Sequence, residues 1–160
     1  MKKDIKFLVM DVDGTLTDGK IYMGSSGELM KAFNIKDGCG IHDLLPKANI
    51  MPLIITGRTS LIVENRCKEV GIIHLFQGVS DKVAQLQKFL TEYNGNLSEV
   101  AYIGDDLNDL ACMCIIKDKG GIIGAPNNAC QQVKDVSDYI SAHVGGDGAV
   151  RDFIEFLVKK

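Results

Sequence analysis

Two aspartates separated by one residue stand near the start of the chain, where a short apolar run ends. Asp11 and Asp13 follow the run that begins at Ile5. A carboxylate can attack phosphorus to form an aspartyl-phosphate, which divides the hydrolysis of a phosphate ester into two steps. Gly14 can turn the chain and bring Asp13 round, so that it could protonate the leaving oxygen and later activate water, a role that requires a raised pKa. The pair therefore predicts a nucleophile at Asp11 and a general acid and base at Asp13.

A second acidic cluster follows a later apolar run, in the string G-D-D-x-x-D at residues 104–109. Several carboxylates close together repel one another unless a cation holds them, and an oxygen-rich site with few ligands suits Mg²⁺. We expect Asp11 and Asp105 to hold Mg²⁺ through their side chains and Asp13 to do so through its main-chain carbonyl. Asp106 and Asp109 are predicted to support this metal site.

Two further side chains suit the handling of a phosphoryl group. Thr56 ends the second apolar run, and Lys82 opens an amphipathic segment. A hydroxyl and an ammonium group fixed beside phosphoryl oxygens can stabilise the charge that redistributes during phosphoryl transfer. We therefore expect Thr56 and Lys82 to complete the catalytic set.

These residues need a scaffold that brings distant parts of the chain together. Short apolar runs predict strands, and segments with helical spacing of apolar residues alternate with them. Strands are predicted at residues 5–10, 51–55, 72–76, 100–103, 122–123 and 139–140, and helices at residues 59–70, 80–93 and 148–158. This alternation predicts an α/β fold with a parallel sheet and helices on both of its faces. Ligands bind beyond the carboxyl ends of such strands, so the polar residues above should converge there.

The segment after the first strand interrupts this alternation. Residues 24–27, Gly-Ser-Ser-Gly, favour a turn between two arms, residues 21–23 and residues 29–35. We expect a β-hairpin inserted at about residues 18–36. Its apolar residues would be a liability on a monomer, so packing against other copies of the chain is favoured over folding back onto its own domain. The spacing leaves no room for a separate lid domain.

Composition narrows the class of protein. A chain of 160 residues with 46% hydrophobic and 24% charged residues suits one globular domain, residues 1–160. The net charge of -3 gives no electrostatic reason to bind nucleic acid or an anionic membrane. No apolar stretch approaches the roughly 18 residues that span a bilayer, and the N-terminus is a poor signal peptide. Five cysteines without a framework spacing favour free thiols and a cytoplasmic location.

The motifs together resemble those of the haloacid dehalogenase superfamily. The strings that carry the resemblance are D-V-D-G-T at residues 11–15, the run ending in Thr56, Lys82, and G-D-D-x-x-D at residues 104–109. D-V-D-G-T-L-T-D-G, T-G-R-T-S at residues 56–60 and G-G-D-G-A-V-R-D at residues 145–152 resemble a narrower group, the 3-deoxy-D-manno-octulosonate 8-phosphate phosphatases and their relatives acting on nine-carbon acids.

This resemblance implies a Rossmann-like fold without a cap and a homotetramer. It also implies Mg²⁺-dependent release of phosphate from an eight-carbon sugar acid that supplies lipopolysaccharide. A nine-carbon keto-acid phosphate is the alternative substrate. Arginine suits recognition of the sugar acid's carboxylate, because its planar fork can bind both oxygens. The expected substrate-binding residues are Arg58, Arg66 and Arg151, the last of them through a glycine-rich turn that could reach a neighbour's site.

Two alternatives from other classes of protein remain. A signalling receiver domain also combines acidic residues, Mg²⁺, a phospho-aspartate, a threonine and a lysine on a parallel sheet. The order of the motifs argues against it, since here D-x-D opens the chain and the larger acidic cluster follows Lys82. A catalytically silent partner domain is the other alternative, and the presence of both Asp11 and Asp13 argues against it.

Overall fold

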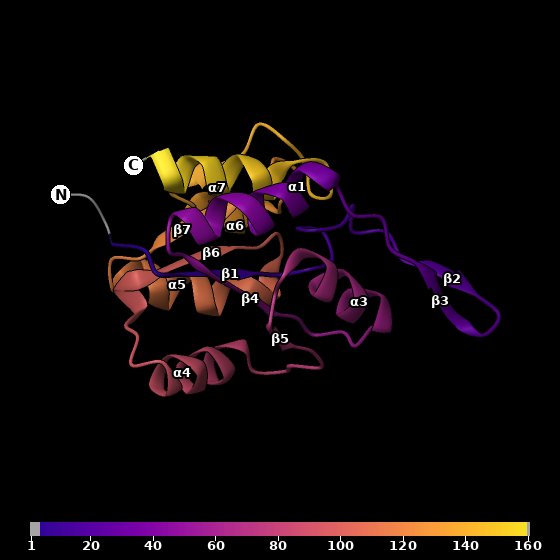
Figure 1. The fold of residues 1–160 in the computed structure, drawn as a ribbon, viewed down its shortest axis with the longest axis horizontal. Helices are drawn as coiled ribbons and strands as arrows, with labels where there is room; N and C mark the ends of the chain where they lie inside the picture. The colour runs from indigo at the N-terminus through magenta and orange to yellow at the C-terminus, as the bar shows by residue number, and fades with distance from the viewer. Residues whose placement is uncertain (1–3, 160) are drawn as a thin grey trace.

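The computed structural model describes residues 4–159, and its centre is one parallel sheet (Figure 1). The sheet has six strands in the order β5-β4-β1-β6-β7-β8. The strands are β1 (Phe7–Met10), β4 (Met51–Ile55), β5 (His74–Phe76), β6 (Val100–Ile103), β7 (Ile122–Ala125) and β8 (Tyr139–Ile140). Strands β1, β6 and β7 are buried along their whole length, which explains why they read as continuous apolar runs rather than as alternating ones.

Helices cover both faces of this sheet, as the alternation predicted. On one face, a core cluster joins the sheet to α3 (Leu61–Val70), α7 (Ala149–Lys159) and a helical stretch formed by α1 (Ile35–Cys39), η1 (Gly40–Leu44) and α2 (Leu45–Lys47). On the other face, a second cluster joins it to α4 (Lys82–Glu92), α5 (Leu110–Asp118) and α6 (Gln131–Val136). Two short 3₁₀ turns, η2 (Leu97–Glu99) and η3 (Leu107–Asp109), flank β6.

Besides the helical stretch at residues 35–47, helices α5 and α6 are absent from the helices that the sequence analysis placed. Helix α5 is rich in apolar residues and buries Cys112, Met113 and Ile116, so its pattern is not clearly amphipathic. Helix α6 has six residues, which is too short for a periodic pattern. The third strand also begins at His74 rather than at Ile72.

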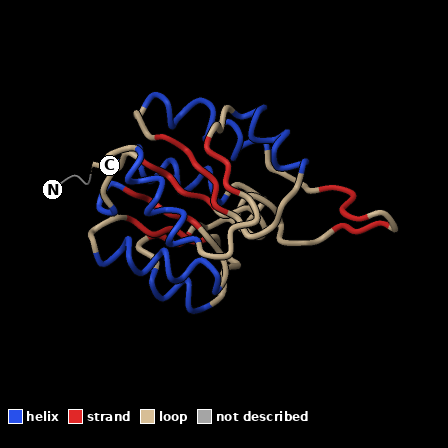
Figure 2. Tube along the Cα trace, turned by 90° about the horizontal axis from the view of Figure 1, so that it is seen from below, coloured by secondary structure: helices blue, strands red, loops and turns tan. Residues whose placement is uncertain are grey.

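The hairpin consists of β2 (Tyr22–Gly24) and β3 (Gly27–Met30), which pair antiparallel and project from the body of the molecule (Figure 2). Its second arm is shorter than predicted. Ile35 begins α1, because the Asn34 side chain accepts a hydrogen bond from the Lys36 amide and caps that helix. Met23 and Leu29 are 59% and 63% exposed, so the apolar face of the hairpin does not fold back onto the sheet.

Among residues 4–159, no helix is long and apolar enough to cross a membrane. The same residues form the sheet, its two helical layers and the hairpin, and no separate lid domain stands over the carboxyl ends of the strands.

Candidate active site

Asp11 is fixed at the carboxyl end of the central strand. Its main-chain amide donates to the Ile103 carbonyl of β6 at 3.1 Å, and the residue is only 4% exposed. The chain then turns sharply, because the amides of residues 15–17 all donate to the Val12 carbonyl. The Thr17 hydroxyl accepts hydrogen bonds from the amides of Gly14 and Gly19. We call residues 12–19 the nucleophile loop.

The glycine within the D-V-D-G-T string is required by close approach and by backbone conformation. Gly14 has a φ of +92°, and a Cβ placed on it would lie 2.0 Å from Asp105 Oδ2. The next residue links the same two segments, because the Thr15 hydroxyl donates to Asp105 Oδ1 at 3.1 Å. The nucleophile loop is therefore packed directly against the end of β6.

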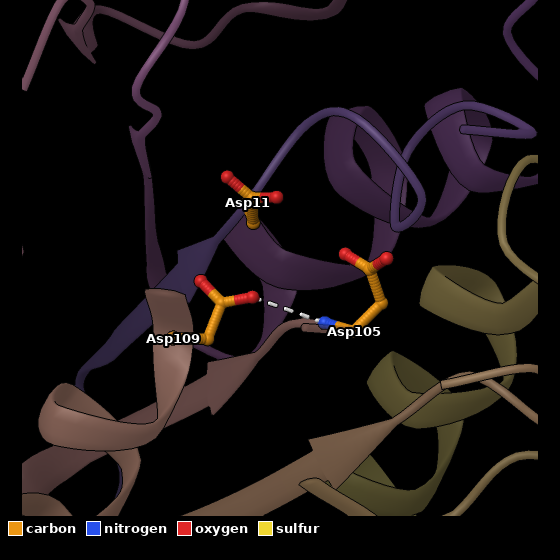
Figure 3. Close-up of side chains that lie close together, drawn as sticks. All are labelled: Asp11, Asp105 and Asp109. Carbon is orange, nitrogen blue, oxygen red and sulfur yellow. Dashed lines mark hydrogen bonds between the residues drawn. The ribbon is translucent and has the colours of Figure 1, made fainter. Parts of the chain in front are cut away.

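Three carboxylates from these segments converge, as Figure 3 shows for Asp11, Asp105 and Asp109. One oxygen of each lies within 4.8 Å of the others. Asp109 is fully buried and already accepts four hydrogen bonds. Its donors are Lys82 Nζ at 2.8 Å, the Tyr102 hydroxyl at 2.7 Å, and the amides of Asp105 and Asp106 at 3.1 and 3.3 Å. Asp109 therefore positions its neighbours, while Asp11 and Asp105 keep oxygens facing the cleft.

Lys82 contacts two of these three carboxylates with its side chain, those of Asp11 and Asp109. It is the first residue of α4, which the Asp81 side chain caps by accepting from the Ala84 amide. Its Nζ donates to Asp11 Oδ1 at 2.7 Å as well as to Asp109, and the side chain is 5% exposed. Burial lowers the pKa of Lys82, but the charges of Asp11 and Asp109 outweigh it and leave that pKa raised.

The clustered carboxyls of Asp11 and Asp105 hold protons more tightly than isolated carboxyls do. Burial, followed by the charge of Asp109, raises the pKa of Asp11 to about 6 against the opposing effect of Lys82. Burial and the charge of Asp11 raise the pKa of Asp105 to about 7. Part of this increase comes from repulsion between neighbouring carboxylates, which a bound cation would relieve.

The Asp13 side chain does not join the cluster of Asp11, Asp105 and Asp109 but contacts the base of the hairpin. Its carboxylate accepts a short hydrogen bond from Lys31 and lies 3.7 Å from Arg58 Nε. Lys31 is 9% exposed and also pairs with Glu28 at 3.0 Å, and Glu28 in turn accepts a hydrogen bond from the Ser60 hydroxyl. Neither Lys31 nor Glu28 was among the site residues predicted from sequence, because a charged residue on an exposed hairpin carries no local signal of burial.

These groups open onto a cleft of about 500 Å³. Its lining consists of Asp11, Asp13, Gly19, Thr56, Gly57, Arg58, Asp105, Asp106, Leu107 and Asn108. Thr56 is buried at the end of β4, with its amide donating to the Phe76 carbonyl. The structure thus brings Asp11, Asp13, Thr56, Lys82 and the acidic cluster to one edge of the sheet, as expected.

The three arginines predicted to bind substrate lie in different parts of the structure. Arg58 lines the cleft. Arg66 pairs with Glu69 and lies over the Phe33 ring, with 5.7 Å between the guanidinium carbon and the ring centroid. Arg151 pairs with Glu155 at 2.7 Å. Neither of these two lines the cleft of its own chain, so their contact with substrate stays a prediction.

The residues present fit a Mg²⁺ ion. Hard oxygen donors gather at one point, the Asp11 and Asp105 carboxylates have raised pKa values that a cation would reverse, and nitrogen and sulfur donors are absent from the cluster of described residues. The Asp13 carboxylate is engaged by Lys31, and a metal contact through the Asp13 main-chain carbonyl stays a prediction.

Comparison of the sequence with known proteins identifies a family of phosphatases, in agreement with the geometry of the site. A model of the haloacid dehalogenase-like hydrolases matches residues 62–154. The 3-deoxy-D-manno-octulosonate 8-phosphate phosphatase KdsC of Salmonella typhi is 42% identical over 156 residues, which cover 98% of this chain and 80% of the relative.

Solved structures give the same result. The 3-deoxy-D-manno-octulosonate 8-phosphate phosphatase of Moraxella catarrhalis, in complex with a magnesium ion, a phosphate ion and KDO, is similar with a TM-score of 0.90 and 43% identity, covering 98% of this chain and 87% of that one. The cobalt-bound phosphatase of Haemophilus influenzae has a TM-score of 0.90 and 32% identity, covering 98% and 89% of the two chains. The chain therefore belongs to the haloacid dehalogenase-like hydrolases and groups among them with the 3-deoxy-D-manno-octulosonate 8-phosphate phosphatases.

Proposed function

We propose that this protein hydrolyses the phosphate ester of 3-deoxy-D-manno-octulosonate 8-phosphate through an aspartyl-phosphate on Asp11. The observation that carries the proposal is the pair of Asp11 and half-buried Asp105, both lining an open cleft, with the buried Lys82 ammonium paired to Asp11. The named activity of relatives that match nearly the whole chain supports the choice of substrate.

In the proposed reaction, an Asp11 carboxylate oxygen attacks phosphorus and the ester oxygen leaves, taking a proton from Asp13. Asp13 then accepts a proton from water as that water attacks the aspartyl-phosphate. The bond between phosphorus and Asp11 breaks, phosphate is released, and the Asp11 carboxylate is restored. Lys82 and Thr56 would hold phosphoryl oxygens during both steps. Lys31 and Arg58 would hold the Asp13 carboxyl at the cleft wall.

The Asp11 and Asp105 side chains and the Asp13 main-chain carbonyl would hold Mg²⁺. When bound, this cation supplies positive charge that offsets the carboxylates and the phosphate. Asp109 would support the site without touching the metal, because its four hydrogen-bond donors already occupy it, and Asp106 would support it as the N-cap of η3.

The substrate's carboxylate would be bound by Arg58, the arginine that lines the cleft. Arg66 and Arg151 would take part only in an assembly that brings them to a neighbouring cleft. We infer such an assembly of single-domain chains from the exposed apolar side chains of the hairpin, Met23, Leu29 and Met30. The family resemblance implies that this assembly is a homotetramer. Five free cysteines support a cytoplasmic location.

The test is phosphate release with Mg²⁺ across a small panel of phosphate esters. The panel contains 3-deoxy-D-manno-octulosonate 8-phosphate, two nine-carbon keto-acid 9-phosphates and simple hexose phosphates. We expect kcat/KM for the eight-carbon acid to exceed the others by more than about tenfold, or ~1.4 kcal/mol of transition-state discrimination. Preference for a nine-carbon acid would keep the mechanism and change the substrate. Silence on every compound, with a stable phosphoprotein after treatment with a small phosphodonor, would instead support a receiver domain.

A further inference from the structure

The string G-G-D-G-A-V-R-D near the C-terminus has no role in the chemistry described so far, yet part of it lies against the nucleophile loop. We call residues 145–148 the glycine loop. The Gly146 amide donates to the Thr15 carbonyl at 3.1 Å. A Cβ on Gly145 would lie 1.9 Å from the Gly14 carbonyl oxygen, and one on Gly146 would lie 2.5 Å from the Asp18 amide nitrogen. Two backbones thus meet with no side chain between them.

The glycine loop is itself anchored by elements outside the site. The Gly145 amide donates to the Asn128 side-chain oxygen at 3.0 Å, in the turn that follows β7. The Asp147 carboxylate accepts from the Asn34 side chain at 3.2 Å, at the start of α1. The buried Asp37 carboxylate of α1 accepts from the Arg151 amide at 2.8 Å in the first turn of α7. The glycine loop is therefore anchored by Asn34 before α1 and by Asn128 after β7, and it leads into α7, which the Asp37 contact ties to α1.

Gly14 and Thr15 connect the glycine loop to the carboxylates of the site. Gly14 is wedged between the Gly145 backbone on one side and the Asp105 carboxylate on the other. Thr15 accepts from Gly146 through its carbonyl and donates to Asp105 through its hydroxyl. Any shift of the glycine loop would be passed to Asp13, which precedes Gly14, and to the orientation of Asp105.

We propose that the glycine loop is a positioning element that presses the nucleophile loop onto Asp105 and so sets the Mg²⁺ site. This inference rests on the proposed function only for its kinetic readout, because Mg²⁺ binding can be measured without any substrate. Gly145 and Gly146 touch no substrate in this arrangement and act through the backbone of residues 14–18.

The test is Gly145→Ala, read by calorimetric titration of Mg²⁺ and by steady-state kinetics. The new methyl group requires the Gly14 carbonyl to move by about 1 Å, a displacement that can cost about 100-fold in rate. Displaced supports of metal ligands typically weaken metal binding by about 10- to 100-fold. We therefore expect Mg²⁺ affinity to fall at least about tenfold and kcat to fall by about 100-fold. KM should change less than about threefold, because Thr56 and Arg58 are untouched.

The matched control is Gly120→Ala. Gly120 follows α5, has a φ of +92°, and has no atom within 4 Å of an added Cβ. This control therefore carries the conformational strain of a substituted glycine without a clash at the site. It should keep the Mg²⁺ affinity and kcat of the unchanged protein within about twofold.

Three outcomes would overturn the proposal. The first is a Gly145→Ala protein with Mg²⁺ affinity and kcat within twofold of the unchanged protein. The second is an equal loss in Gly120→Ala, which would indicate general destabilisation. If Gly145→Ala does not fold, the test uses Asn128→Ala, which removes the exposed side chain that anchors Gly145 without adding an atom. The third outcome is measured on this variant. Unchanged Mg²⁺ affinity there would refute the positioning role, and a loss of several-fold would support it. A protein that binds Mg²⁺ as expected but releases no phosphate would count against the proposed function alone.

Discussion

Replacing Asp109 with asparagine tests whether the buried carboxylate, rather than the metal, holds the site together. Asp109 has one oxygen facing Lys82 and Tyr102 and the other facing the amides of Asp105 and Asp106. Asparagine is the same size but offers one oxygen and one NH₂ group. Whichever way its amide is turned, its NH₂ group will face at least one group that can only donate, either the Lys82 ammonium or a main-chain amide.

The expected cost follows from these contacts. Removing one partner of a buried ion pair costs about 3–5 kcal/mol. Lys82 retains Asp11 as a partner at 2.7 Å, which places the expectation near the lower end, about 3 kcal/mol. Relief of repulsion between Asp109 and its neighbouring carboxylates would offset part of this cost, so Mg²⁺ should be present at saturation to remove that repulsion in both proteins.

The assay is thermal unfolding with and without the substitution, together with kcat. At about 2–4 °C per kcal/mol for a chain of this size, we expect Tm to fall by roughly 6–12 °C. Asp106→Asn is the control, because Asp106 is exposed and caps η3, where asparagine is an equally good N-cap. The control should stay within about 0.5 kcal/mol of the unchanged protein. If Asp109→Asn unfolds within about 1 kcal/mol of Asp106→Asn, the buried carboxylate does not have the structural role described here.

Four other predictions concern the site and the hairpin. Asp11→Asn should abolish turnover while far-ultraviolet circular dichroism stays unchanged, and substantial residual activity would exclude Asp11 as the nucleophile. Because the pKa values of Asp11 and Asp105 are raised to about 6 and about 7, protons compete with the cation at low pH, so calorimetric Mg²⁺ affinity should rise from about pH 5 to about pH 8. The metal-free folded protein then binds more protons than the unfolded chain between about pH 4 and pH 7, so its free energy of unfolding in urea should fall as pH rises across that window; a rise would contradict the assignment. Removing residues 22–30 should dissociate the assembly, and an unchanged mass by light scattering would refute the interface.

The placement of Lys31 illustrates what local sequence does not show. Lys31 directly follows β3 and, judged from sequence alone, is a charged residue of an exposed hairpin, yet its side chain is buried between Asp13 and Glu28. That burial arises because the base of the hairpin contacts two other segments: Lys31 pairs with Asp13 of the nucleophile loop, and Glu28 accepts a hydrogen bond from Ser60 before α3. Contacts between residues so far apart in sequence depend on the tertiary fold.

The sequence predicted the class of chemistry and the order along the chain of the strands in the main sheet. Buried parallel strands leave continuous apolar runs, and polar residues at their carboxyl ends must meet at one edge, so residue order alone assigns Asp11, Thr56 and Asp105 to one site. Helix α5, apolar around most of its circumference, lacks the periodic signal that a half-buried helix carries, and for that reason it was not predicted.

The surroundings of each carboxylate depend on the tertiary fold. The sequence grouped Asp106 and Asp109 as supports, but burial and hydrogen bonding separate them, since Asp109 is saturated by four donors while Asp106 caps a solvent-exposed turn. The packing of the glycine loop on Gly14 is likewise invisible in sequence, because residues 14 and 145 meet only after β1 and α7 have been packed. The physical reason is the same in both cases: residue type and spacing encode local preference and chemical capability, whereas burial and backbone contact depend on what the rest of the chain places nearby.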